Sequence, residues 1–462
     1  MERSNKLLYW SITVALAGFL FGFDTVVISG AEKSLQAIWG TSDLFHGWVV
    51  VSMALWGTVI GAIFGSIPTE KLGRKRTLIW IGVLYFISAV GSALATGPYV
   101  FAAFRFIGGL GVGASTIAAP AYVSEIAPAA KRGRLVALYQ FNIVLGILIA
   151  FISNYLFSGI EHNAWRYMMG VEAIPALIYT LMVLGVPKSP RWLMLHQHAT
   201  EEARAIMHRI NPAAKPAEIE RAIQAILANE AEVKRTPGLS FRKYRFLFLL
   251  AFLIAFFNQL SGINAFLYYA PRIFEEAGLG QSTALLSSIG IGVTNLVFTI
   301  FGLILIDRLG RRQLMYIGSV GYILSLAVVS MAFLNDWGGM IVAMALFVFI
   351  AAHAIGQGSV IWVFISEIFP NHLRAYGQGF GSSTHWVLAA LIPALIPFLF
   401  ESPNFGAWLV FAFFAFMMVL QLLFVAFLMP ETKGVPLEEL QHKLIKSEAP
   451  KQEAVTSQTP AL

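Results

Sequence analysis

Twelve long apolar stretches dominate this chain and restrict what it can fold into. A helix needs about 20 mostly apolar residues to cross the hydrocarbon core of a bilayer. The stretches approach or exceed this length, because 57% of the residues are apolar and only 12% are charged. They lie at about 7–28, 47–67, 77–95, 99–123, 134–157, 165–186, 244–271, 282–306, 313–334, 340–366, 375–400 and 406–429. The sequence therefore predicts an all-α membrane protein with twelve transmembrane helices.

Short phrases near the ends of these stretches recur half a chain apart. Ser124–Pro128 (SEIAP) returns as Ser366–Pro370 (SEIFP), 242 residues later. The other two pairs are Gly73–Lys75 with Gly310–Arg312, and Pro187–Pro190 with Pro430–Lys433. Repeats in one order at nearly one offset indicate an internal duplication. Because each half then holds six spans, an even number, both halves should have the same orientation in the membrane.

The basic residues predict the topology. Of the 32 Lys and Arg, all but four fall at the termini or in alternate loops on one side. The exceptions are Lys33, Arg166 and Arg272 on the other side and Arg105 within a span. Cytoplasmic loops carry an excess of Lys and Arg, so both termini are expected in the cytoplasm. The net charge of +7 then reflects topology, and we expect no nucleic-acid partner.

The spans and the repeat together predict four segments. These are an N-terminal six-helix bundle (1–186), a cytoplasmic amphipathic helical linker (187–243), a C-terminal six-helix bundle (244–429) and a cytoplasmic tail (430–462). In the linker, Pro216 is placed to begin a helix, and Ile219, Ile223 and Ile226 recur at helical spacing among charged residues. We expect these helices to connect the two bundles rather than to bind a ligand.

Several classes of protein are disfavoured by what the chain lacks. The absence of Cys excludes disulfides and thiolate metal sites. With no phosphate-binding loop and no cluster of metal ligands, we expect no enzyme activity, no cofactor and no metal. The first apolar stretch is too long for a signal peptide, so we expect a retained span. No Asn-x-Ser/Thr sequon occurs, which favours a bacterial inner-membrane protein, and we expect a monomer.

Six motifs together resemble the sugar porter family of the major facilitator superfamily. They are Gly22–Asp24, Gly73–Lys75, Arg105–Gly109, Pro187–Arg191, Gln259–Asn264 and Pro430–Gly434. The resemblance covers essentially every span. It implies a major facilitator fold of two six-helix bundles in the lipid bilayer, which carries a monosaccharide or polyol by alternating access.

The resemblance also implies a cytoplasmic gate. Ion pairs at the inner helix ends hold that side closed when the carrier faces outward, and they part as it opens inward. One interfacial pair contributes about 0–1 kcal/mol, but several pairs that link the two halves can bias a conformation. Simple topological anchoring of these charges remains an alternative. The implied gate residues are Arg74, Glu125, Arg132, Asp307, Arg311, Glu367 and Arg374.

A second group of residues is expected to line a sugar cavity. Amides offer donors and acceptors to hydroxyl groups, and aromatic rings pack on sugar C–H surfaces. The stretch 258–269 is rich in polar side chains, which are costly in a span, and Ser261–Gly262 favours a local break. Helix–helix hydrogen bonding by the amides and plain packing of the tryptophans remain alternatives. The expected substrate-binding residues, most of them implied by the resemblance, are Gln140, Asn258, Gln259, Asn264, Tyr268, Asn295, Trp362, His385 and Trp386.

The chain departs from the family pattern near this cavity. Asn258 stands where a Gln is usual, His385 where a Gln or Asn is common, and Gly358–Ser359 replaces Gly-Pro. His385 could donate to a hydroxyl or titrate near neutral pH, or it could be tied to a backbone carbonyl. Ile147 is apolar, as in the family's glucose facilitators rather than its bacterial xylose symporter. This favours a hexose over a pentose.

Asp24 and Arg105 are expected to meet inside the membrane. Each lies ~6–9 Å below the outer end of its span at 1.5 Å per residue. An ionised carboxylate in a span is costly unless it is paired. In the family this aspartate marks proton-coupled members, whereas facilitators carry asparagine, so Asp24 and Arg105 are the predicted proton-coupling residues. A purely structural ion pair is the alternative.

These features predict a monosaccharide symporter with the proton as coupling ion. An uncoupled sugar or polyol facilitator is the first alternative, and it differs in that sugar would not drive proton uptake. A non-transporting sugar sensor is the second. Sensors of this family carry long cytoplasmic extensions, whereas the tail after Pro430 is about thirty residues long.

Overall fold

A computed structural model of the chain describes residues 5–128, 132–212, 214–235, 241–370, 373–402, 405–435 and 444. Within these ranges the chain forms helices and connecting turns without a strand. Helices are expected in a membrane, because the lipid core offers no hydrogen-bond partner for a backbone N–H or C=O. A helix satisfies both groups internally.

The first half of the chain and the segment between the halves contain fifteen helical elements. Their bounds are α1 (Asn5–Val27), η1 (Ile28–Gly30), α2 (Glu32–Trp39), α3 (Asp43–Phe45), η2 (His46–Val51), α4 (Met53–Phe64), α5 (Ser66–Lys71), α6 (Arg74–Ala93), α7 (Pro98–Ile126), α8 (Arg132–Phe157), α9 (Ala164–Gly170), α10 (Ala173–Leu184), α11 (Pro190–Gln197), α12 (Thr200–Ile210) and α13 (Pro216–Arg235). The second half contains α14 (Phe241–Leu260), α15 (Ile263–Glu276), α16 (Gln281–Leu309), α17 (Arg311–Leu334), α18 (Gly339–Ile355), α19 (Gln357–Ile368), α20 (Arg374–Glu401) and α21 (Gly406–Phe427).

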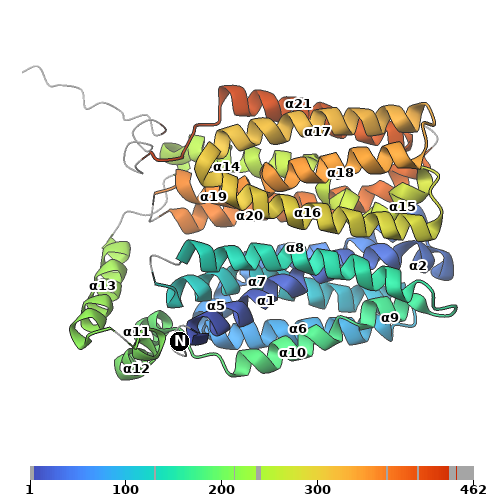
Figure 1. Cartoon of the computed structure of the whole chain (residues 1–462). Helices are drawn as coiled ribbons and strands as arrows, with labels where there is room; N and C mark the ends of the chain where they lie inside the picture. Colours follow the sequence, from blue (N-terminus) through green and yellow to red (C-terminus); the bar gives the residue numbers. More distant parts are fainter. Residues whose placement is uncertain are drawn as a thin grey trace, which may run out of the picture.

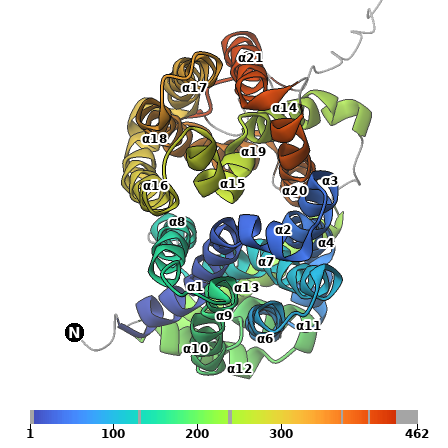
Figure 2. The ribbon, with the colours of Figure 1, turned by 90° about the vertical axis from the view of Figure 1, so that its right-hand side faces the viewer.

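The long helices form two bundles that lie side by side (Figure 1). In the first bundle α1 packs on α8, and α7 packs on α4 and α6. In the second, α17 packs on α18 and α21, and α14 packs on α20. Seen along the bundle axes, the helices of each half surround their own centre (Figure 2).

The predicted number of spans agrees with the helices. Eleven helices of the described chain are long and apolar enough to cross a membrane. The twelfth span is the pair Asp43–Val51 and Met53–Phe64, bent by 41°. Its first part contains the π-helical stretch His46–Val51, and such wide turns break the regular hydrogen-bond ladder of a helix.

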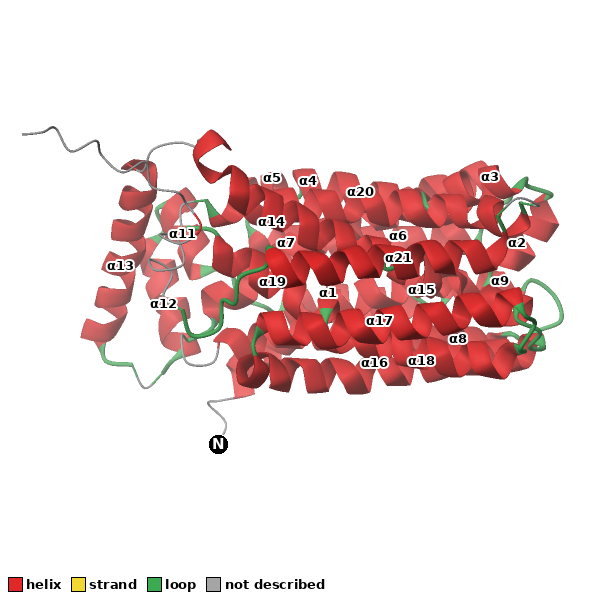
Figure 3. Cartoon of the chain, turned by 90° about the horizontal axis from the view of Figure 1, so that it is seen from above, coloured by secondary structure: helices red, strands yellow, loops and turns green. Residues whose placement is uncertain are grey.

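The two ends of the molecule differ. Helices α11–α13 lie at one end, here called the linker end, while α2, α3 and α9 lie at the opposite, distal end (Figure 3). The linker helices share a small core that includes Trp192, Ile206 and Ile223. Trp192 Nε1 donates to the Glu70 carbonyl oxygen at 2.6 Å, which docks the linker on the first half.

The two halves touch through α8 with α16 and through α4 with α20. Toward the distal end, a Cβ added to Gly47 on η2 would lie 2.1 Å from the Ala394 carbonyl oxygen of α20. Lys33 also forms an ion pair with Glu275 of the other half there. The distal end is therefore closed by direct contact between the halves.

Within the first half, glycines let helices approach backbone to backbone. A Cβ on Gly109 of α7 would lie 1.9 Å from the Ala54 carbonyl oxygen of α4. Small residues at such crossings permit the van der Waals packing that holds membrane helices together. By contrast, Gly379 of α20 has no heavy atom within 4 Å of its added Cβ.

We expect Gly109→Ala to destabilise the protein, because the clash is with backbone and overpacking costs about 1–3 kcal/mol. The matched control Gly379→Ala should be neutral or slightly stabilising, since Ala favours helix over Gly by about 1 kcal/mol. Thermal unfolding in detergent, followed by tryptophan fluorescence, measures both. Equal melting temperatures for the two variants would contradict the close α4–α7 crossing.

Candidate functional site

A break in the first span of the second half brings three amides together. Gly262, between α14 and α15, has φ of 83°, a conformation that favours glycine, and it confirms the predicted break at Ser261–Gly262. Gln259 Nε2 donates to Asn258 Oδ1 at 2.9 Å. Asn264 Nδ2 donates to Gln259 Oε1 at 2.8 Å. The turn thus gathers amides from both sides of the break.

Aromatic rings stand next to these amides. Gln259 Nε2 lies 3.1 Å and 3.2 Å from the two ring nitrogens of His385. The His385 ring lies between Trp362 and Trp386, with centroid distances of 5.2 Å and 4.8 Å. Trp386 also contacts Phe21 of the first half at 5.5 Å. The buried Nε1 of Trp386 has no hydrogen-bond partner among the described residues, so this donor is unpaired in this arrangement.

The remaining expected sugar residues lie in three places. Asn295 is buried on α16, where Thr299 Oγ1 lies 3.4 Å from its Oδ1. Gln140 is half-buried on α8, the helix of the first half that packs on α16. Tyr268 is fully buried and interacts with Thr25 of α1, so it contacts the first half instead of the amide cluster.

A second polar network lies behind the amides and was not foreseen from the sequence. Asn258 Nδ2 lies 3.5 Å from Gln357 Oε1, and Gln357 Nε2 donates to Gln421 Oε1 at 2.8 Å. Gln421 Nε2 in turn donates to Ser319 Oγ at 2.9 Å. The signal was available, because an amide in an apolar span is costly unless it is hydrogen-bonded. The network fixes α14 against α17, α19 and α21.

Asp24 and Arg105 meet inside the first half, as the matched depths predict. Arg105 Nη1 lies 2.5 Å from Asp24 Oδ1, and Nη2 donates to the Asp24 carbonyl oxygen at 2.9 Å. Both side chains are almost completely buried. Removing one partner of such a pair typically costs about 3–5 kcal/mol, because the other charge is left uncompensated.

Glu172 is a further member of this charged site that the sequence reasoning missed. It is buried where α9 meets α10, within hydrogen-bonding reach of Asp24 and close to Arg105. Its Oε1 has no partner among the described residues. A glutamate in the middle of an apolar stretch was a usable signal. The site therefore holds two carboxyl groups and one guanidinium group.

At the linker end the repeated phrases meet in space, once in each half. Arg74 Nη2 lies 2.9 Å from Glu125 Oε1, and Ser189 Oγ donates to Glu125 Oε2 at 2.5 Å. In the second half Arg311 Nη2 lies 2.7 Å from Glu367 Oε1, and Thr432 Oγ1 donates to Glu367 Oε2 at 2.6 Å. Each cluster joins the start of a helix, the end of a span and the chain that leaves the sixth span.

The other expected gate residues take different positions. Arg374 donates from Nε to the Ser366 carbonyl oxygen at 2.8 Å, whereas its neighbour Glu367 is bound by Arg311. Asp307 lies 3.4 Å from Arg311 and is exposed, so this pair contributes little. Arg132 begins α8, but its side chain lies outside the described residues. Among the described residues, no ion pair at this end joins the two halves.

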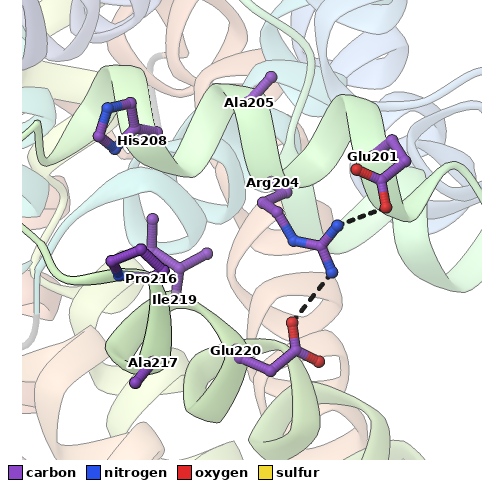
Figure 4. Close-up of a pocket in the computed structure, with 8 residues that line it drawn as sticks. All are labelled: Glu201, Arg204, Ala205, His208, Pro216, Ala217, Ile219 and Glu220. Atoms are coloured by element: carbon purple, nitrogen blue, oxygen red, sulfur yellow. Dashed lines mark hydrogen bonds and ion pairs between the residues drawn. The ribbon is translucent and has the colours of Figure 1, made fainter.

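A surface hollow of about 570 Å³ lies between α12 and α13 in the linker (Figure 4). Arg204 forms ion pairs with Glu201 and Glu220, with 2.9 Å to Glu220 Oε2. Hydrogen bonding to Arg204 lowers the pKa of the Glu220 carboxyl. Arg204, Glu201 and Glu220 are already paired with one another and no amide side chain lines the hollow, so we read it as a gap between two linker helices and not as a sugar site.

Comparison with known proteins agrees with this arrangement. The family model described as "Sugar (and other) transporter" matches residues 10–444. The D-xylose-proton symporter of Escherichia coli is 33% identical, covering 95% of this chain and 96% of its own. The glucose transporter GlcP of Staphylococcus epidermidis is also 33% identical, covering 96% and 98%. The structure of E. coli XylE in a partially occluded inward-open conformation superposes with a TM-score of 0.83 at 32% identity, covering 94% of this chain and 100% of XylE.

The family model and these relatives cover nearly the whole chain, and the two bundles match a solved member of the same fold. The protein is thus a multi-pass membrane transporter and not an enzyme. It belongs to the sugar porter family of the major facilitator superfamily.

Proposed function

We propose that this protein imports a monosaccharide together with a proton by alternating access. The observation that carries the proposal is the buried site of Asp24, Arg105 and Glu172, which lies beside α15, the helix that carries Asn264 of the amide cluster. A relative named as a sugar-proton symporter supports the same reading.

The amide cluster has the chemistry for binding sugar hydroxyls. The amides of Gln259 and Asn264 can each donate and accept, and the Trp386 indole offers an unpaired donor. The rings of Trp362 and His385 add a wall on which C–H faces can pack. Before sugar arrives the amides bond to one another, so binding exchanges these hydrogen bonds for new ones.

Gln259→Ala should weaken sugar binding by about tenfold, because each lost hydrogen bond costs about 0.5–1.5 kcal/mol and Asn264 also loses its partner. Titration calorimetry on monodisperse protein in detergent measures the affinity. Asn335→Ala is the control, since Asn335 is exposed and bonds only within its own helix end. Unchanged affinity in the Gln259 variant would place the sugar elsewhere.

Two carboxyl groups beside one guanidinium group form a site suited to one exchangeable proton. Arg105 can balance one carboxylate, whereas a second uncompensated charge in this dry setting would be costly. Tyr268 interacts with Thr25 beside this site, and it lies one helical turn from Asn264 on α15. We infer that α15 couples the occupancy of the sugar site to the protonation of the Asp24 site.

Asp24→Asn should abolish sugar accumulation against a gradient while leaving sugar binding and counterflow exchange largely intact, because the variant is permanently neutral at that position. Glu172→Gln should move the pH dependence of uptake without abolishing binding. Uptake into proteoliposomes, with and without an imposed pH gradient, measures these effects. Glu161→Gln is the control, because Glu161 is exposed on a loop at the distal end.

Undiminished pH-driven accumulation in the Asp24 variant would overturn coupling through this residue. His385 would then be the next candidate. If the unmodified protein equilibrates sugar without moving protons, the uncoupled facilitator is correct. If sugar binds but never crosses the membrane, the sensor is correct.

The linker end is proposed to face the cytoplasm, because alternate loops and both termini on that side hold most Lys and Arg. The distal end is closed by contacts between the halves, and the linker-end ion pairs stay within each half. Both features support an inward-facing arrangement, as does the similarity to inward-open XylE. When the linker end closes, we propose that Arg374 and Glu367 contact charges of the opposite half.

Arg374→Gln should shift the carrier further toward the inward-facing state, because the contacts we propose for Arg374 exist only when the linker end is closed. A cysteine introduced at Ser383, half-buried on α20, should then react faster with a maleimide in membranes. The chain has no native cysteine, so the label is specific. Arg204→Gln, which removes a charge that is paired within the linker, is the control. Equal rates in the variant and the parent would leave only topological anchoring.

The proposed substrate is a hexose in preference to a pentose. Ile147 is buried on α8, two helical turns from Gln140, so this position adds an apolar contact in place of a second amide. Extra apolar surface suits the additional carbon of a hexose. Competition by a panel of hexoses and pentoses against one labelled sugar tests the preference.

A further inference from the structure

A buried charge cluster closes the distal end between the two halves. At its centre is Arg272 of α15, which is 5% exposed. Its Nη1 lies 3.3 Å from Glu32 Oε2 and donates to Gln36 Oε1 at 2.9 Å. Its Nη2 lies 3.1 Å from Glu401 Oε1. Glu32 and Gln36 belong to α2 of the first half, whereas Glu401 ends α20 of the second, so one guanidinium group joins three helices.

The carboxylate of Glu32 is held from a second direction. His46 Nε2 lies 3.3 Å from the same Oε2 atom, and His46 Nδ1 lies 3.2 Å from Thr41 Oγ1. Glu32 and His46 are both fully buried. The Arg272–Glu32 ion pair therefore differs from an exposed one, because neither of these two charges can be fully hydrated while the distal end is closed. The nearby pair of Lys33 and Glu275 is more exposed.

Arg272 lies on α15, the helix that also reaches the two sites described above. The same helix carries Asn264 of the amide cluster and Tyr268 beside the Asp24 site. The helix is irregular at Tyr269 and contains Pro271, so its distal part can tilt without the rest of the span. A polar pocket of about 280 Å³ lies beside this part of the helix, and Arg272 and Glu32 are among its lining residues.

We propose that Arg272, Glu32 and Glu401 form a distal latch, in which Arg272 is a positioning residue that holds α15 against the first half. The latch bonds between the halves exist only when the distal end is closed, so they favour that state over the distal-open state. Its role in a transport cycle rests on the proposed function, but its effect on the conformation does not.

The test uses Arg272→Gln in the full chain, with a reporter cysteine in place of Ser29, a buried residue that lines the polar pocket. A polymer maleimide too bulky to pass through the centre of the protein reacts only when the distal end opens. In detergent without sugar, we expect labelling about tenfold faster than in the Ser29→Cys parent, equivalent to about 1.4 kcal/mol.

The matched control is Arg166→Gln. Arg166 is also a distal arginine, but it donates to the Ala93 carbonyl oxygen and stacks over Trp165 within the first half. Its loss should leave the labelling rate unchanged. An equal rise in both variants would overturn the latch, as would no rise in the Arg272 variant.

A double variant guards against misfolding of the single one. Glu32→Gln with Arg272→Gln removes both buried charges, and it should label as fast as the single variant, because the two residues act as one unit. A labelling rate that stays at the parent value in the double variant would overturn the proposal. Titration calorimetry with sugar on the same proteins tests the proposed function separately from the latch. Faster labelling without any sugar binding would contradict the proposed function and still support the latch.

Discussion

A guanidinium group that binds a carboxylate beside a hydroxyl group sets the structure of each half. In the first half Arg74, Glu125 and Ser189 tie the start of α6 to the end of α7 and to the chain that leaves α10. Arg311 and Glu367, with Thr432, repeat the arrangement in the second half. Each cluster thereby joins three segments of its half at the linker end. Rigid halves are what a carrier needs if its cavity is to open by rocking instead of by unfolding.

These clusters also explain the repeated phrases of the sequence. The three phrases lie far apart along each half, yet they meet at one place in the fold. A change in the Glu125 side chain would remove its bonds to both Arg74 and Ser189, so the three phrases depend on one another. The repeated phrases therefore mark residues that contact one another in each half, in addition to indicating a duplication.

The sequence predicted those features that depend on the residue type and on the free-energy cost of placing that residue in a membrane. Twelve spans follow from the length of apolar stretches, and the pairing of Asp24 with Arg105 follows from the cost of a lone charge at a matched depth. The break at Gly262 follows from residue type.

The sequence did not predict which partner each buried polar or charged residue of a span would contact. Glu172 and Gln421 are conspicuous in apolar spans, but whether they face Asp24 or Ser319 depends on how helices rotate and cross. Tyr268 was expected in the sugar cavity, and it interacts with Thr25 beside the charged site. Arg374 is close to Glu367 in the sequence, yet in the structure Glu367 forms its ion pair with Arg311.

The docking of the linker has a consequence for how motion in this protein can be observed. Outside the linker, the described contacts of α11, α12 and the residue that precedes them join the linker to the first half: Trp192 with Glu70, Ser189 with Glu125, and Arg209 over the ring of Trp10. These helices must then turn with the first half as one body. A fluorophore on the exposed face of α12, paired with another at the linker end of α17, would therefore report changes in the distance between the two halves without a label inside the membrane.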